Sequence, residues 1–171
     1  MRFTILAAEW NAKLVALAKV MNSKVALPIY STFLLELKDG VLRITASDMD
    51  CSRCSTLPVM DMDRANEHNG SLCVTASFLL DSLKNLGDQP VTFEADEENL
   101  SVVIRYNNGQ FDMVGFPAKD YALPGTMGKS VQVTIEASVL NDSIGKSLYA
   151  VGNDDLRPIF CGIYFTKKGD E

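Results

Sequence analysis

Histidine and tryptophan are nearly absent from this 171-residue chain, which contains one of each. With one histidine, no recognisable Ser–His–Asp constellation and no glycine-rich phosphate loop, the sequence offers little basis for an enzyme. Long hydrophobic runs are also missing, because no stretch reaches the roughly 18 apolar residues that a membrane span needs. Residues 1–6 carry one positive charge and too short an apolar stretch for a signal peptide. We therefore expect a non-catalytic, cytoplasmic protein with no membrane partner.

Basic residues are outnumbered by acidic ones, with 16 lysines and arginines against 22 aspartates and glutamates. The resulting net charge of -6 argues against nucleic-acid binding, because phosphate contacts need lysine and arginine. Net charge does not exclude a basic face on an acidic body, however. Composition alone therefore leaves the function open.

The cysteines give only a superficial metal pattern. Cys51-x-x-Cys54, together with His68 and Cys73, has the residue types of a zinc site. A zinc site needs a tight turn that aims both thiolates at one point, whereas residues 50–60 have the pattern of a strand, in which residues three apart face opposite sides. We expect reduced thiols in a cytosolic chain, and neither a metal nor a cofactor.

Residues 1–117 show one order of elements twice: a strand, a helix and three strands. The first helix is indicated by apolar Trp10, Leu14, Leu17 and Met21 at helical spacing, and Ser77 is the expected N-cap of the second. Such a repeat predicts an α+β domain with two helices side by side against antiparallel sheet. The expected helices are 9–22 and 77–87, and the expected strands are 2–7, 30–38, 41–46, 50–60, 71–76, 91–95, 100–106 and 110–116.

The pattern restarts after residues 118–129, which contain proline and glycine and are the expected linker. When the first 41 residues are shifted by 130, they overlay the last 41 without a gap and match at seven positions. This repeat predicts tandem domains, with a complete domain over 1–117 and the start of a second over 130–171. The second lacks strands that its sheet needs, so we expect a chain that is cut short and whose unpaired strands associate with another copy.

Five motifs, taken in order, point to one family. They are Met1-Arg2-Phe3-Thr4-Ile5, Leu27-Pro28-Ile29-Tyr30, Thr45-Ala46-Ser47-Asp48-Met49-Asp50, the stretch 111–117 followed by Asp120-Tyr121-Ala122-Leu123-Pro124, and the stretch 150–165. Together they resemble the bacterial sliding clamps, the beta subunits of DNA polymerase III. The resemblance spans nearly the whole chain.

That resemblance implies the DNA-clamp fold, with one complete domain and the first part of a second. Clamps of this family are three-domain subunits that pair head to tail as a homodimer ring around duplex DNA, with helices lining the hole and sheets forming the outer wall. The ring tethers the polymerase and slides with it, so the subunit performs no bond chemistry. The implied partners are duplex DNA without sequence preference, a second copy of the subunit, and peptide motifs of the polymerase catalytic subunit and the clamp loader.

The resemblance also implies roles for particular residues. Phe111 and Met113 match the subunit interface, and Arg157 and Phe160 match the start of the pocket for partner peptides. An acid at Asp154 departs from what a DNA-facing loop would carry. The positions that match DNA-contacting ones, or lie on the helices expected to face DNA, are Lys24, Lys19, Lys13, Lys84, Lys146 and Asn153.

Plainer interpretations remain open for each of these residues. The lysines equally fit solvated helix faces, and Phe111 and Met113 equally fit a core or an ordinary sheet edge. A tandem α+β protein-interaction module without a DNA role is the main alternative, and basic residues such as Lys19, opposite the apolar helix face, favour the clamp over it. A metal-dependent nuclease would need acid pairs to converge in one pocket. Those pairs are Asp48/Asp50, Asp61/Asp63 and Asp154/Asp155.

Overall fold

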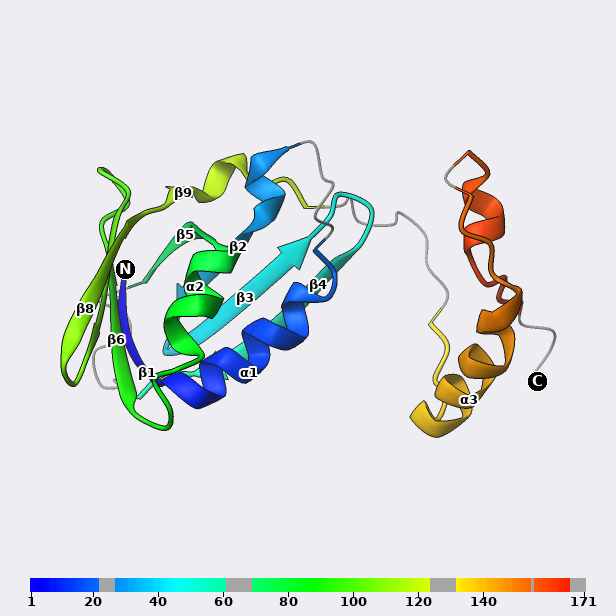
Figure 1. Cartoon of the computed structure of the whole chain (residues 1–171), viewed down its shortest axis with the longest axis horizontal. Coiled ribbons are helices and arrows are strands. Elements are labelled where there is room, and N and C mark those ends of the chain that lie inside the picture. The colour runs from blue at the N-terminus through cyan, green and yellow to red at the C-terminus, as the bar shows by residue number, and fades with distance from the viewer. Residues whose placement is uncertain (22–26, 61–68, 124–131, 155, 167–171) are drawn as a thin grey trace. The chain divides into compact units, whose positions relative to one another are not determined.

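The structure is a computed structural model that describes residues 1–21, 27–60, 69–123, 132–154 and 156–166. It divides into two compact units, Met1–Thr126 and Met127–Glu171 (Figure 1). Five residues that the sequence singled out lie outside the described residues, namely Lys24, Asp61, Asp63, His68 and Asp155.

The first unit confirms the repeated order of a strand, a helix and three strands. Three short additions accompany it: the 3-10 turns Pro28–Ser31 and Ala118–Asp120, and the strand β9 (Phe116–Pro117). The repeated elements are β1 (Arg2–Leu6), α1 (Ala7–Ala18), β2 (Thr32–Lys38), β3 (Val41–Ser47), β4 (Ser52–Pro58), β5 (Gly70–Thr75), α2 (Ala76–Leu83), β6 (Pro90–Ala95), β7 (Ser101–Tyr106) and β8 (Gly109–Val114).

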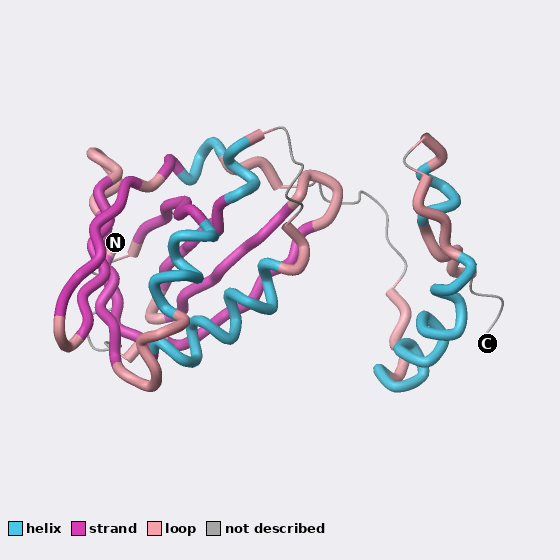
Figure 2. Tube along the Cα trace, in the orientation of Figure 1, coloured by secondary structure: helices cyan, strands magenta, loops and turns pink. Residues whose placement is uncertain are grey.

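The strands form two antiparallel sheets, and each sheet takes one strand from the other repeat. The four-stranded sheet has the order β1-β6-β7-β8, and the five-stranded sheet has the order β4-β3-β2-β5-β9. Thus β1 pairs with β6, and β5 pairs with β2. Because of this exchange neither repeat completes a sheet alone, so the two repeats form a single domain. Figure 2 shows both helices covering the sheets.

The core lies between the helices and the sheets. Trp10, Leu14 and Leu17 of α1 are fully buried, and α1 and α2 lie side by side, as the sequence predicted. Phe3 stacks on Phe93 with ring centroids 4.9 Å apart, and Trp10 meets Phe3 edge-on at 5.4 Å. Burial of each such side chain stabilises the folded state by about 1.5–3 kcal/mol. Because Phe3 and Trp10 come from the first repeat and Phe93 from the second, this aromatic cluster also joins the two repeats.

Both helices differ in their bounds from the sequence prediction. α1 ends at Ala18, because Val20 and Met21 donate their backbone amides to the carbonyls of Leu17 and Ala18, three residues back, which tightens the last turn. α2 begins directly after β5, with Thr75 in the N-cap position and no side-chain cap. The expected N-cap role of Ser77 is therefore wrong, since Ser77 already lies inside the helix.

Residues 116–122 belong to the first unit and pack on its five-stranded sheet, although the sequence assigns 118–129 to a linker. β9 pairs with β5, and the ring of Tyr121 is buried against Leu34, Cys73 and Tyr30. The hydroxyl of Tyr30 donates a hydrogen bond of 3.0 Å to the carbonyl oxygen of Ala122. This segment covers an apolar patch on the face of the five-stranded sheet that lies away from the helices.

The second unit repeats the first at an interval of 130 residues. Its helix α3 (Ala137–Ser147) begins 130 residues after α1, and its 3-10 turn Pro158–Cys161 lies 130 residues after Pro28–Ser31. Residues 132–136 and 162–166, the counterparts of β1 and most of β2, pair with no strand among the described residues. Several large apolar side chains of this unit are exposed, namely Val133, Ile135, Val139, Leu148, Tyr149, Leu156, Ile159, Phe160, Tyr164 and Phe165.

Candidate functional site

The strand β8 is one of the two edge strands of the four-stranded sheet, and β1 is the other. Among the described residues β8 pairs only with β7, so its other side presents unpaired backbone groups. Side chains alternate along it: Phe111 and Met113 face the helices, whereas Gln110 and Asp112 lie on the outer face of the sheet. The sequence expectation of Phe111 and Met113 at an edge is consistent with this placement, and their role as an interface stays a prediction.

Phe111 stands at the rim of an aromatic group that the sequence did not reveal. Its ring stacks on Tyr106 at 5.0 Å and meets Phe78 of α2 edge-on at 6.4 Å. Phe78 is 37% exposed, so the group is only partly covered. Gly109 permits this arrangement, because a Cβ there would lie 2.8 Å from the Tyr106 hydroxyl. A hollow of about 530 Å³ beside these rings is lined by Ser77, Phe78, Asp81, Ser82, Asn85, Leu86 and Phe111.

A polar network crosses the outer face of the same sheet and ends at β8. The Glu94 carboxylate lies 3.3 Å from both Arg2 of β1 and Arg105 of β7. Arg105 donates to the Gln110 side-chain oxygen at 2.6 Å, and Gln110 donates to both carboxylate oxygens of Asp112 at 2.9 Å. The sequence shows that polar residues alternate along these strands, which indicates one solvent-facing side of the sheet. Only the strand register shows that these polar side chains contact one another.

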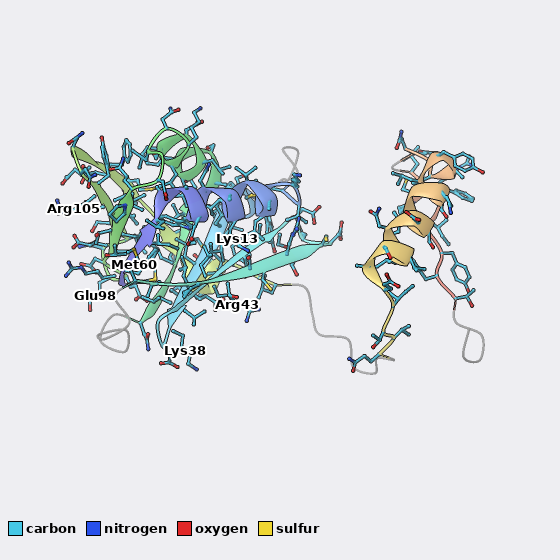
Figure 3. All side chains as sticks on the ribbon, turned by 90° about the horizontal axis from the view of Figure 1, so that it is seen from below. Lys13, Lys38, Arg43, Met60, Glu98 and Arg105 are labelled. Atoms are coloured by element: carbon cyan, nitrogen blue, oxygen red, sulfur yellow. The ribbon has the colours of Figure 1, made fainter. Side chains whose placement is uncertain are left out.

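The helix lysines of the first unit differ in their surroundings. Lys13 is exposed on α1 (Figure 3), and Lys19 is exposed at the C-cap of that helix. Lys84, at the C-cap of α2, lies 2.8 Å from the Asp81 carboxylate, which offsets its charge. No ion pair to Lys13 or Lys19 occurs within the described ranges. Lys13 and Lys19 are therefore the freer cations of this helix pair.

The predicted residues of the second unit are all exposed. Lys146 lies in the last turn of α3, where its charge favours the helix dipole, and Asn153 lies in the following loop. Arg157 pairs weakly with Asp154 at 3.7 Å, and its carbonyl oxygen accepts the amide of Phe160 at 3.0 Å. Arg157 and Phe160 thus belong to one turn.

No group of three or more metal-ligating side chains comes together in the part of the chain that the structure describes. Cys51 and Cys54 are exposed, whereas Cys73 is buried on β5. Burial raises the pKa of the Cys73 thiol to about 12, which favours the neutral form. Among the described residues, no helix is both long and apolar enough to cross a membrane.

Known proteins resemble both the sequence and the fold. Residues 1–124 match the family described as DNA polymerase III beta subunit, N-terminal domain. The Beta sliding clamp of Bacillus subtilis (strain 168) is 25% identical over 166 residues, which cover 95% of this chain and 44% of that protein. The Beta sliding clamp of Staphylococcus aureus (strain Mu50 / ATCC 700699) is 24% identical over the same shares.

The fold match extends over nearly the whole chain. A solved structure of the DNA polymerase sliding clamp from Pseudomonas aeruginosa superposes with a TM-score of 0.83 at 23% identity. The match covers 94% of this chain and 42% of the Pseudomonas chain. The chain therefore spans less than half the length of the relatives that it matches.

Proposed function

Because the chain belongs to the DNA polymerase III beta subunit family, we propose that it forms part of a cytoplasmic sliding clamp. In this role a ring encircles duplex DNA and holds the replicative polymerase on it during DNA replication. The observation that carries the proposal is the doubled unit of a strand, a helix and three strands, with two adjacent helices on one side of the sheets. The ring acts by topology, so we propose a processivity factor that makes and breaks no bonds itself.

The face of α1 and α2 that lies away from the sheets is the proposed DNA-facing surface. Lys13 and Lys19 supply its available positive charge, because Lys84 is paired with Asp81. Cations that contact phosphates bind without sequence preference and release counterions, so the contact weakens steeply with salt. Contact through exposed lysines such as these gives weak direct affinity, which suits a ring that must slide. Lys24, Lys146 and Asn153 remain proposed contacts on family grounds.

The open strand β8 is the proposed subunit interface. Strand addition to an exposed sheet edge supplies backbone hydrogen bonds, and side chains beside the edge supply specificity. Phe111, which lines the hollow beside α2, and Met113, two residues along the same strand, offer apolar surface for a partner strand. We propose that β8 pairs with the complementary edge of a second subunit, in the head-to-tail homodimer.

Arg157 and Phe160 are proposed to contact peptide motifs of the polymerase catalytic subunit and the clamp loader. Phe160 is 61% exposed, and Arg157, at the N-cap of the same 3-10 turn, is exposed as well. An exposed aromatic ring and a guanidinium group are the residue types that dominate peptide interfaces.

A loading experiment on closed and open DNA tests the proposed function. The protein, expressed to its natural stop codon, is loaded on a nicked circular plasmid by its clamp loader, and the DNA is then linearised. Retention on circles and loss from linear ends is the expected result, because a ring leaves DNA only over an end. Equal binding to both forms, or to neither, would contradict the clamp and favour the interaction module.

A further inference from the structure

The carboxylate of Asp112 lies on the open edge of the four-stranded sheet, on the face opposite Phe111 and Met113. Its position is fixed by Gln110, whose amide donates to both of its oxygens at 2.9 Å. An amide carries no charge, so Gln110 orients the negative charge of Asp112 without neutralising it. The Asp112 carboxylate is thus held in one orientation, in which it can accept a hydrogen bond from a cationic side chain.

The nearby cations are engaged elsewhere. Arg105 contacts Glu94 and Gln110, and Arg2 contacts the same Glu94 carboxylate. Within the described ranges no ion pair reaches Asp112. The network therefore runs from β1 across the sheet and leaves one unpaired acid at the edge, in a chain whose net charge is already -6.

The backbone of Asp112 is also directed toward the open edge. Gly115 donates its amide to the carbonyl oxygen of Leu100 at 2.8 Å. Bonded and non-bonded pairs alternate along an antiparallel ladder, so this bond turns the backbone groups of Gln110, Asp112 and Val114 away from β7. A strand that adds to β8 would bond to these groups. It would also place a side chain roughly 5 Å from the Cβ of Asp112.

We propose that β8 selects a partner edge strand that carries lysine or arginine opposite Asp112. On its other face this partner strand carries an aliphatic or aromatic side chain, which enters the hollow beside Phe78 and Phe111. Opposite charges on directly facing cross-strand positions stabilise the pair, and like charges destabilise it, so an acidic edge is rejected. This inference rests on the proposed use of β8 as a subunit interface, and it defines the chemistry of the partner.

Two synthetic β-hairpin peptides test the proposal on the chain as it stands. Their exposed strands alternate valine with lysine in one peptide and valine with glutamate in the other. Amide resonances of residues 109–114 in the isotope-labelled chain report binding to β8. We expect the lysine peptide to bind about two- to fivefold more tightly, which is the range for one exposed charge pair.

Substitutions at the edge assign the preference to Asp112. Asp112→Asn should remove the preference, and Asp112→Lys should reverse it in favour of the glutamate peptide. The matched control is Glu98→Gln, which removes one charge from an exposed acid in the β6–β7 turn (Figure 3) and should leave the preference unchanged. Circular dichroism verifies that each variant is folded.

The outcomes separate this inference from the proposed function. If both peptides shift the β8 resonances with equal affinity, charge selection by Asp112 is wrong, while β8 still accepts a strand. If neither peptide perturbs β8, the use of this edge as an interface is contradicted as well. A preference that persists in Asp112→Asn would also overturn the assignment, because the charge would then act from elsewhere.

Discussion

The rings of Tyr30 and Tyr121 meet edge-on, with centroids 5.5 Å apart and an interplanar angle of 64°. Tyr30 precedes β2, whereas Tyr121 follows the last strand of the first unit, so this contact joins the early part of the domain to its end. Tyr121 is 6% exposed and also contacts the patch formed by Leu34 and Cys73. The segment that leaves the domain is thereby held against the five-stranded sheet.

Replacement of Tyr121 should destabilise the domain. Tyr121→Ala removes a buried aromatic ring and leaves a cavity over Leu34 and Cys73, so the free energy of unfolding should fall by about 3 kcal/mol. Urea denaturation followed by tryptophan fluorescence measures the change, because Trp10 lies in the core of this unit. Tyr149→Ala is the control, since Tyr149 is 89% exposed and its loss should change stability by less than about 0.5 kcal/mol. Equal effects of both variants would contradict the packing.

The same tyrosine should make stability depend on alkaline pH. Burial raises the pKa of Tyr121 from 10.0 to about 12, and burial likewise raises the pKa of Cys73 from 9.0 to about 12. Both groups are neutral when protonated, so the folded state binds their protons more tightly than the unfolded state does. Their stabilising contribution is full below about pH 9 and is lost as the pH rises toward 12.

Denaturation midpoints measured from pH 8 to pH 11 test this expectation. The midpoint of the unaltered protein should fall across that range. The midpoint of Tyr121→Phe should fall less steeply, because this variant lacks the titrating hydroxyl. An identical slope in Tyr121→Phe would show that Tyr121 does not contribute to the pH dependence.

The helix lysines should differ in their effect on DNA affinity. In the protein expressed to its natural stop codon, Lys13→Ala should weaken binding to duplex DNA and lower the slope of log affinity against log salt by about one. Lys84→Ala should have a smaller effect, because Asp81 already offsets the charge of Lys84. Lys38→Ala is the charge-matched control, since Lys38 is exposed at the end of β2, away from the helices (Figure 3). Equal losses for Lys13→Ala and Lys38→Ala would count against a DNA-facing helix surface.

Truncation of Phe111 should impair subunit pairing more than folding. Phe111→Ala removes the ring at the rim of the hollow, and loss of an interface hot spot costs about 2 kcal/mol or more, or roughly 30-fold in the dimer dissociation constant. Sedimentation velocity on the protein expressed to its natural stop codon measures this constant. Phe116→Ala, at a partly exposed aromatic residue of β9 in the other sheet, is the control and should leave pairing unchanged. A dimer of unaltered strength in Phe111→Ala would contradict the proposed edge.

Hydrophobic periodicity predicted the elements, but their ends depended on local contacts. The positions of Trp10, Leu14 and Leu17 predicted α1, because one apolar face every 3.6 residues is what a helix buries. Its end at Ala18 followed from hydrogen bonds of the last turn, and those bonds leave no signal in apolar spacing. Ser77 was expected as a cap because serine favours that position, but α2 begins directly after β5 at Ala76 without a side-chain cap, so Ser77 lies inside the helix.

The sequence by itself determined the order of elements and the repeat at 130 residues, because both are written in local patterns of apolar and polar residues. Only the tertiary structure decided which strands exchange between repeats, which strand stays open at the edge, and which charges meet. Glu94 lies far from Arg2 in the sequence, yet its carboxylate contacts both Arg2 and Arg105 on the neighbouring strands. The register of β7 with β8 places Arg105 opposite Gln110, which in turn orients the Asp112 carboxylate. The cross-strand pairs of Arg2 and Arg105 with Glu94 depend on the register of the sheet, which no short window of sequence contains.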